Sequence, residues 1–231
     1  RVIDGAEGSF VNWIDAEAVL TAQNDDQRDW TFSTEQLFML EITNLSTYTT
    51  GVLFDISGLN GGISLLSSTV DDKLFVRYDQ ATGSQAGIED LRGPSLRLRV
   101  GTMGYYDYKF YYSTSYSQNY RNLMPMMKLS EMYYIVAENH VRLDENAEAL
   151  LMLDKVRAAR GITDAYPSTV DASVELTREY YREFIGEGVL FYYLKHKRAV
   201  TSIEPTFDLS YDDLVYPYPI EEVNYGRLQE L

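Results

Sequence analysis

The sequence contains no cysteine and only two histidines among its 231 residues. Disulfide bonds, thiolate metal ligands and cysteine nucleophiles are therefore excluded. Zinc needs three or four converging ligands, and neither His140 nor His196 belongs to an H-E-x-x-H motif. Glycine-rich phosphate loops, dinucleotide fingerprints and a G-x-S-x-G elbow are also missing. The sequence thus predicts no cofactor and carries no motif for the common metal, nucleotide or serine chemistries.

Long apolar runs are missing as well. The longest runs, Met132–Ala137 and Val189–Leu194, have six residues each, whereas a membrane-spanning helix needs about 20. The chain starts at Arg1 with no initiator methionine and no signal-peptide pattern. It is compatible with a mature, a trimmed or a partial protein.

Basic residues are scarce, with 20 Lys+Arg against 35 Asp+Glu and a formal net charge of -15. Such a surface repels phosphate backbones and anionic lipids, so we expect no nucleic-acid partner. A glycosidase carboxylate pair is possible among so many acids, but no spacing marks one. The Asp pairs at 25–26, 71–72 and 212–213 lack EF-hand spacing, so loop solvation is favoured over calcium binding.

Tyrosine is abundant instead, with 20 residues beside 9 Phe and 2 Trp. Its ring offers an apolar face and a polar tip, which suits half-wet surfaces and stacking sites. Most of these rings are nevertheless expected to be structural. The apolar share of 45% is that of an ordinary globular domain.

The first half reads as one helix followed by short strands and loops. Ser9 can cap a helix that carries Trp13 and Ile14 on one face. Glu35–Thr43 is an apolar run of strand length, and the stretch from Asn44 to Ser64 has the composition of a long loop. Residues that alternate with period two predict further short strands at 73–78, 96–100 and 105–112.

The second half reads as helical. A helix is predicted from about Pro125 to Asn139, then a turn at Leu143–Asn146 and a second helix that ends before Gly161. This hairpin is the size of one tetratricopeptide unit. A third helix runs from Ser173 to about Ile185 and is interrupted by glycines before an aromatic-basic stretch to Arg198. The inward residues of the second helix are expected to be Ala149, Leu150, Leu153 and Val156.

Four blocks in this half resemble the SusD/RagB family of outer-membrane nutrient-binding lipoproteins. MMKLSEMYYIVAE at 126–138 is similar to P-x-h-R-L-A-E-M-Y-L-I-x-A-E, and AEALLMLDKVRAARG at 147–161 to A-x-x-x-L-N-x-V-R-x-x-R-G. REYYREFIGEG at 178–188 resembles E-R-x-x-E-F-x-x-E-G, and VYPYPIEE at 215–222 the closing L-P-I-P-x-x-E. The order and spacing of all four blocks agree with the family.

One block departs from the family pattern E-G-x-R-x-x-D-L-x-R. Leu190 stands at the position of its Arg and Tyr193 at that of its Asp, and the resulting aromatic version GEGVLFYYLKHKR resembles a sub-pattern of the family. The remaining motif residues have a structural interpretation as hairpin core. Arg157, near a helix end, is expected to bind carbonyls or to pair with a buried glutamate such as Glu131 or Glu187.

The resemblance implies a mainly α, SusD-like scaffold with a tetratricopeptide-type hairpin, long irregular loops and a few short strands. We expect residues 1–231 to be the C-terminal part of such a domain, packed as one unit. Residues 1–123 would form a loop- and strand-rich ligand side, and residues 124–231 the helical family-signature region. The missing N-terminal half of the chain would then be a partner, and the helical hairpin 126–160 would pack against it or against a transporter.

The resemblance also implies a function. Such a protein is a surface-exposed lipoprotein of the outer membrane in Bacteroidetes-type bacteria, with its lipid anchor outside this sequence. It binds an oligosaccharide, works with a SusC-like TonB-dependent transporter and is not an enzyme. The alternatives are a peptide-binding module, a purely protein–protein interaction module of the same scaffold, or a glycoside hydrolase.

Aromatic residues in the loops of the first half are the predicted ligand site, because those on helix stripes are needed for the core. Trp30 and Tyr48 form the leading pair, with Asn44 or Arg28 as partners for sugar hydroxyl groups. Trp13 is a weaker candidate, because its predicted helix position gives it a core alternative.

Overall fold

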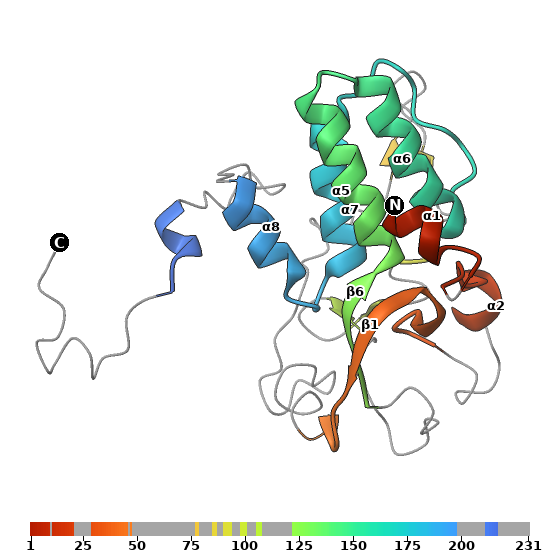
Figure 1. The fold of residues 1–231 in the computed structure, drawn as a ribbon, viewed down its shortest axis with the longest axis vertical. Helices are drawn as coiled ribbons and strands as arrows, with labels where there is room; N and C mark the ends of the chain where they lie inside the picture. Colours follow the sequence, from red (N-terminus) through yellow and green to blue (C-terminus); the bar gives the residue numbers. More distant parts are fainter. Residues whose placement is uncertain are drawn as a thin grey trace, which may run out of the picture. The chain divides into compact units, whose positions relative to one another are not determined.

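The computed structural model describes residues 1–9, 11–20, 29–45, 47, 77–78, 85–86, 90–93, 98–100, 105–107, 122–197 and 211–216 (Figure 1). The chain falls into two compact units, Arg1–Glu187 and Gly188–Leu231, and each is described by itself. The described part is mainly helical with few short strands, which confirms the predicted fold class. Packing of all 231 residues as one unit stays a prediction.

The first unit is built on helices α5 (Leu129–Arg142), α6 (Asn146–Ala159) and α7 (Ala172–Phe184), which pack against one another (Figure 1). Helices α5 and α6 form the predicted hairpin through a short turn, in which Asp144 has a φ of 59°. The inward residues of α6 are buried as predicted. The buried residues of α5 and α7 include Leu129, Tyr133, Tyr134, Ala137, Leu176, Tyr180 and Phe184.

The ends of these helices follow the signals in the sequence. Helix α6 ends before Gly161, whose φ of 85° is a left-handed value that suits glycine. Asp171 caps α7, since its carboxylate accepts a hydrogen bond from the Ser173 amide at 2.8 Å. Gly186 and Gly188 also have positive φ values, 75° and 81°, and they end the helical path as predicted.

Strands β1 (Gln36–Glu41) and β6 (Leu123–Lys128) pair in an antiparallel ribbon (Figure 1). Strand β1 confirms the predicted strand. The prediction that a helix begins near Pro125 is wrong, because Pro125 lies in β6 opposite Met39 and α5 begins at Leu129. Both strands of a two-stranded sheet are edge strands, where proline is tolerated.

The predicted helix from Ser9 is also wrong. Two five-residue helices, α1 (Val2–Ala6) and α2 (Ala16–Leu20), flank an irregular segment that contains Trp13 and Ile14. Gly8 turns the chain with a φ of 75°, and its amide donates to the Val11 carbonyl at 2.9 Å. Asp15 rather than Ser9 caps the helix, with its carboxylate 3.0 Å from the Ala18 amide.

Short elements complete the first unit. A 3-10 turn, η2 (Ser33–Glu35), precedes β1. Strands β2 (Arg77–Tyr78) and β3 (Gln85–Ala86) pair antiparallel, as do β4 (Leu98–Val100) and β5 (Tyr105–Asp107). The predicted strands at 73–78, 96–100 and 105–112 thus hold strand residues wherever they are described. The predicted loop after Asn44 lies mostly outside the described residues.

The second unit contains helix α8 (Val189–Lys197) and the 3-10 turn η3 (Tyr211–Leu214), which contact each other. Tyr193, Leu194 and Leu214 are buried, whereas Tyr192 and Tyr216 are among the most exposed large side chains of the described part. No helix of the described ranges has the length and apolar content needed to cross a bilayer.

Candidate functional site

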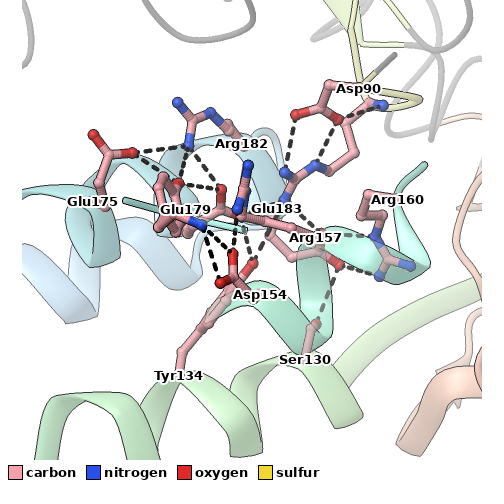
Figure 2. A network of polar contacts seen from close by, with 12 residues as sticks. Asp90, Ser130, Tyr134, Asp154, Arg157, Arg160, Glu175, Glu179, Arg182 and Glu183 are labelled. Atoms are coloured by element: carbon pink, nitrogen blue, oxygen red, sulfur yellow. Dashed lines mark hydrogen bonds and ion pairs between the residues drawn. The ribbon is translucent and has the colours of Figure 1, made fainter. Parts of the chain in front are cut away.

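The most developed polar site is a network of buried ion pairs between α6, α7 and the segments before them (Figure 2). Arg160, just after α6, is its first centre. Its Nη1 and Nη2 donate to the two carboxylate oxygens of Glu35 at 2.8 and 2.6 Å. Its Nη2 and Nε donate to Glu183 of α7 at 2.7 and 3.1 Å. One guanidinium thus joins segments separated by more than one hundred residues of chain.

Arg92 is the second centre. Its Nε and Nη2 form a two-pronged pair with Asp90, each at 2.9 Å. Its Nη1 donates to Glu179 at 2.8 Å and to Glu183 at 3.3 Å. The amide of Leu91 adds a backbone hydrogen bond to the Arg160 carbonyl at 3.0 Å. The segment 90–93 is therefore fixed to the helices by backbone and side chain together.

A third cluster lies along α7 around Tyr166. The Tyr166 hydroxyl donates to Glu175 at 2.8 Å, and Arg182 donates to Glu179 at 2.7 Å. Arg157 lies over the Tyr166 ring, with its guanidinium carbon 3.7 Å from the ring centre, and pairs with Asp154. The predicted partners of Arg157, carbonyls or a buried glutamate such as Glu131 or Glu187, are wrong. Its Nη1 pairs with Asp154 one turn earlier on the same helix, and its Nε and Nη2 have no hydrogen-bond partner among the described residues.

Glu187, the last residue of the first unit, is held by a separate pair. Its carboxylate accepts a hydrogen bond from Lys128 at 2.5 Å, and both side chains are 1% exposed. Glu131 lies near this pair. Burial and, after it, the Glu187 charge raise the pKa of Glu131 above its ordinary value. The junction between β6 and α5 is thereby tied to the end of α7.

Burial of so many charges is tolerated because each faces an opposite charge. Burial alone would raise the pKa of Glu179, but Arg92 and Arg182 lower it to about 2. Burial likewise opposes ionisation of Glu183, yet Arg160 brings its pKa well below the usual range. The pKa of the Tyr134 phenol is raised by burial and then by the charge of Glu179.

This arrangement is suited to holding the fold and unsuited to acid–base chemistry. A general acid must keep its proton near neutral pH, whereas Glu179 and Glu183 stay ionised. The network therefore explains the arginine and glutamate positions of two family-like blocks as parts of the scaffold. The sequence analysis did not predict that Asp90, Arg92 and Glu35 belong to a buried network. The only indication in the sequence is that each is a charged residue close to apolar residues.

The structure describes three of the five predicted ligand residues, namely Trp13, Trp30 and Asn44. Trp30 is 5% exposed and packs in a small core with Ile14, Ala16 and Phe32. Asn44 is exposed, with a φ of 61°. Arg28 and Tyr48 lie outside the described residues. Their roles in binding stay predictions.

Trp13 lies outside any helix and is half-buried. Its indole N–H donates to Glu7 at 2.8 Å, and the same carboxylate accepts from the Tyr133 hydroxyl at 2.5 Å. The rings of Trp13 and Tyr133 are 5.6 Å apart between centroids. Burial and the hydrogen bond to Glu7 raise the pKa of Tyr133 above its ordinary value. Among the described residues no group of three or more His, Asp or Glu side chains could hold a metal ion.

The fold is thus a mainly helical domain in which the charged residues of the motif blocks form ion pairs that hold the helices together. The model of the SusD family matches residues 73–224. The match covers more than half of the chain, so the chain belongs to the SusD family. No curated protein and no solved structure matches it.

Membership confirms the resemblance read from the four sequence blocks. Members of the SusD family are typically binding proteins rather than enzymes. The family is associated with nutrient uptake at the outer membrane.

Proposed function

We propose that this chain captures oligosaccharides at the outer-membrane surface and passes them to a SusC-like TonB-dependent transporter. The family match over residues 73–224 is the observation that carries the proposal. It takes in α5, α6, α7 and α8, the elements with the most regular structure. We extend the proposal to a surface-exposed lipoprotein of Bacteroidetes-type bacteria, which labelling of intact cells with an antibody to the chain would test.

The two glutamates of α7 at the centre of the buried network are unsuited to hydrolysis of a glycosidic bond. Glu179 and Glu183 are 0% exposed and are paired with Arg92 and Arg160. Hydrolysis of a glycosidic bond needs one carboxyl group that holds a proton and a second one about 5–10 Å away, both facing the sugar. Carboxylates that are buried and kept ionised by arginine fulfil neither requirement.

Trp13 is the predicted ligand residue whose described surroundings best fit a contact with sugar. Its hydrogen bond to Glu7 fixes the indole, and a fixed ring loses little conformational entropy on binding. Trp30 is mostly covered by its core neighbours, so its contact with ligand would require that core to open. Arg28, Asn44 and Tyr48 stay in the proposed site as partners for hydroxyl groups and as a stacking ring.

A protein-interaction module is the second candidate, and the β1–β6 ribbon favours it. Phe38, Leu40, Met126 and Met127 of this ribbon are 41–50% exposed. Four of the seven methionines of the chain lie in it, namely Met39, Met124, Met126 and Met127. Flexible, polarisable methionine side chains are common on surfaces that bind other proteins. Such a surface is compatible with docking to a transporter.

Native affinity electrophoresis tests the proposed function. The chain is run through gels that contain starch, xylan, galactan, levan or polygalacturonate, and we expect retardation by at least one of them. The same mixtures are assayed for new reducing ends, and none is expected above the blank. Sustained release that is lost on substitution of one carboxylate would instead establish a hydrolase. Capture of the transporter without retardation by any glycan would favour the protein-interaction module.

A further inference from the structure

Helix α8 of the second unit carries an aromatic surface that neither the predicted site nor the buried network uses. Tyr192 is 66% exposed and Tyr216, which follows η3, is 69% exposed. Phe191 contacts both rings, with centroid distances of 5.4 Å to Tyr192 and 5.0 Å to Tyr216. We call these three residues the α8 platform.

The order of residues along α8 places two of the rings of the platform on one side of the helix and the buried residues on another. Tyr193 and Leu194 are buried, so the side of α8 that carries Phe191 and Tyr192 is directed elsewhere. Lys195 follows Phe191 by four residues, which places both on one side of the helix. Its ammonium lies 5.8 Å from the centre of the Phe191 ring. A cation and three rings are thus adjacent.

The exposed surface of the platform is aromatic and carries polar tips, unlike the exposed apolar residues of the helical hairpin. Ile135, Leu143 and Leu151 are 42%, 66% and 52% exposed, and their side chains are purely aliphatic. Tyr192 and Tyr216 each present a ring face together with a hydroxyl group that donates and accepts hydrogen bonds. Adjacent apolar faces and hydrogen-bonding tips complement a sugar ring, which has a C–H face and a rim of hydroxyls.

We infer that the α8 platform, Phe191, Tyr192 and Tyr216 with Lys195 beside them, binds a sugar ring of an oligosaccharide chain. The inference rests on the proposed glycan-binding function and adds to it a site in the second unit. Tyr192 and Tyr216 supply the stacking faces. Phe191 contacts both tyrosine rings, and the Lys195 ammonium donates hydrogen bonds to hydroxyl oxygens.

A sugar contact at the α8 platform would explain why the segment GEGVLFYYLKHKR is rich in aromatic residues. The family pattern places Arg and Asp where this chain has Leu190 and Tyr193. Tyr193, at the position of that Asp, is 5% exposed, and so is Leu194, which matches the Leu of the pattern. Phe191 and Tyr192 stand at positions where the pattern specifies no residue. The rings of the platform are therefore a feature of this chain's own sequence.

The test is native affinity electrophoresis of the full chain in the five polysaccharides named above. We expect Tyr192→Ala combined with Tyr216→Ala to weaken the retarding interaction by about tenfold, by analogy with other aromatic stacking contacts. Phe at both positions should preserve most of the interaction, because the ring faces are kept. Leu143→Ala removes an equally exposed side chain from the other unit and serves as the matched control. Circular dichroism checks that each variant is folded.

Each outcome bears on a different claim. Equal retardation of the wild type and the double alanine variant overturns the platform and leaves the proposed function standing. Loss of retardation with the double phenylalanine variant also overturns it, because stacking needs only the rings. A double alanine variant that binds glycan normally but no longer captures the transporter makes the platform a protein-docking surface. A wild type retarded by none of the five polysaccharides contradicts the proposed function itself.

Discussion

The two units differ in the unusual side chains that they bury or expose. The first unit buries charges, since Arg92, Arg157 and Arg160 are each 0% exposed. The second unit leaves rings on its surface, with Tyr192 and Tyr216 at 66% and 69%. When a buried charge has an opposite charge beside it, removal of either partner is strongly destabilising, so the arrangement of the pair is fixed. Exposed rings add little to stability and are available for contact.

This difference separates scaffold from function. The arginines and glutamates that identify the family at the sequence level are used inside the first unit. They hold α6, α7 and the segments around Glu35 and Arg92 together. We infer that the residues which contact a ligand lie outside this network. Variants in each region should therefore affect different measurable quantities.

Loss of Arg160 should have the largest effect. Arg160→Met would leave the carboxylates of Glu35 and Glu183 buried without their cation, so we expect a loss of about 3–5 kcal/mol in the free energy of unfolding. Urea denaturation of the chain measures it. Arg142→Met is the matched control, because the Arg142 side chain is 55% exposed in its pair with Glu138. The control should change stability by less than about 1 kcal/mol. Equal losses of stability in both variants would contradict the claim that the buried network stabilises the first unit.

Trp30→Ala should have the next largest effect. Trp30 is 5% exposed among Ile14, Ala16 and Phe32, so its removal leaves a cavity and should cost about 3 kcal/mol of stability. The exposed ring of Tyr192 offers the contrast, because Tyr192→Ala should cost less than about 0.5 kcal/mol. Thermal unfolding of both variants compares them. A Trp30→Ala variant with wild-type stability and weakened glycan binding would return Trp30 to the ligand site.

Acid should weaken the first unit by an amount on the order of 2–3 kcal/mol. The folded-state pKa of Glu179 is about 2, whereas an unfolded glutamate titrates at about 4.3. A lowered pKa gives stability that is complete well above the unfolded value and is lost as the pH falls through the folded one. The loss should therefore develop from about pH 5 down to pH 2 in urea titrations. Glu179→Gln should make the free energy of unfolding less dependent on pH in this range. An unchanged pH dependence would show that Glu179 is not its source.

The smallest effect is expected at Glu131. Its raised pKa, caused by burial and then by Glu187, means that the charged form is disfavoured in the folded chain. A carboxyl group whose pKa is higher in the folded than in the unfolded chain adds to the free energy of unfolding while it holds its proton. This contribution is lost as the pH rises through the folded-state pKa. Glu131→Gln should thus leave stability at pH 7 unchanged or increase it by less than about 1 kcal/mol. A clear decrease in the unfolding midpoint would show that the Glu131 charge is needed.

The helical hairpin could be predicted because its information is local. Apolar residues at helical spacing, Gly161 after α6 and Asp171 before α7 each act within one or two turns. The N-terminal helix was misplaced because Ser9 and Asp15 are both good capping residues. The turn at Gly8 leaves Asp15 as the residue that caps a helix.

The ion network could not be predicted because it depends on pairs far apart in the chain. Glu35 meets Arg160 across 125 positions, and Arg92 meets Glu183 across 91. Periodicity carries no information on such partners. Arg157 and Arg160 both lie near the end of α6 and cannot be told apart by their position in the sequence. Arg160 pairs with Glu35 and Glu183. Arg157 instead pairs with Asp154 of its own helix. The choice between two such arginines is made by tertiary packing.

One crossed measurement tests the central claim that charges inside the first unit set stability while exposed rings set binding. The unfolding midpoint and the polysaccharide affinity are measured for Glu179→Gln and for the double variant Tyr192→Ala, Tyr216→Ala. The account predicts a lower midpoint for Glu179→Gln and unchanged affinity at 10 °C, with circular dichroism to check that the variant is folded. It predicts an unchanged midpoint with about tenfold weaker affinity for the double variant. The account is contradicted if midpoint and affinity fall together in both variants.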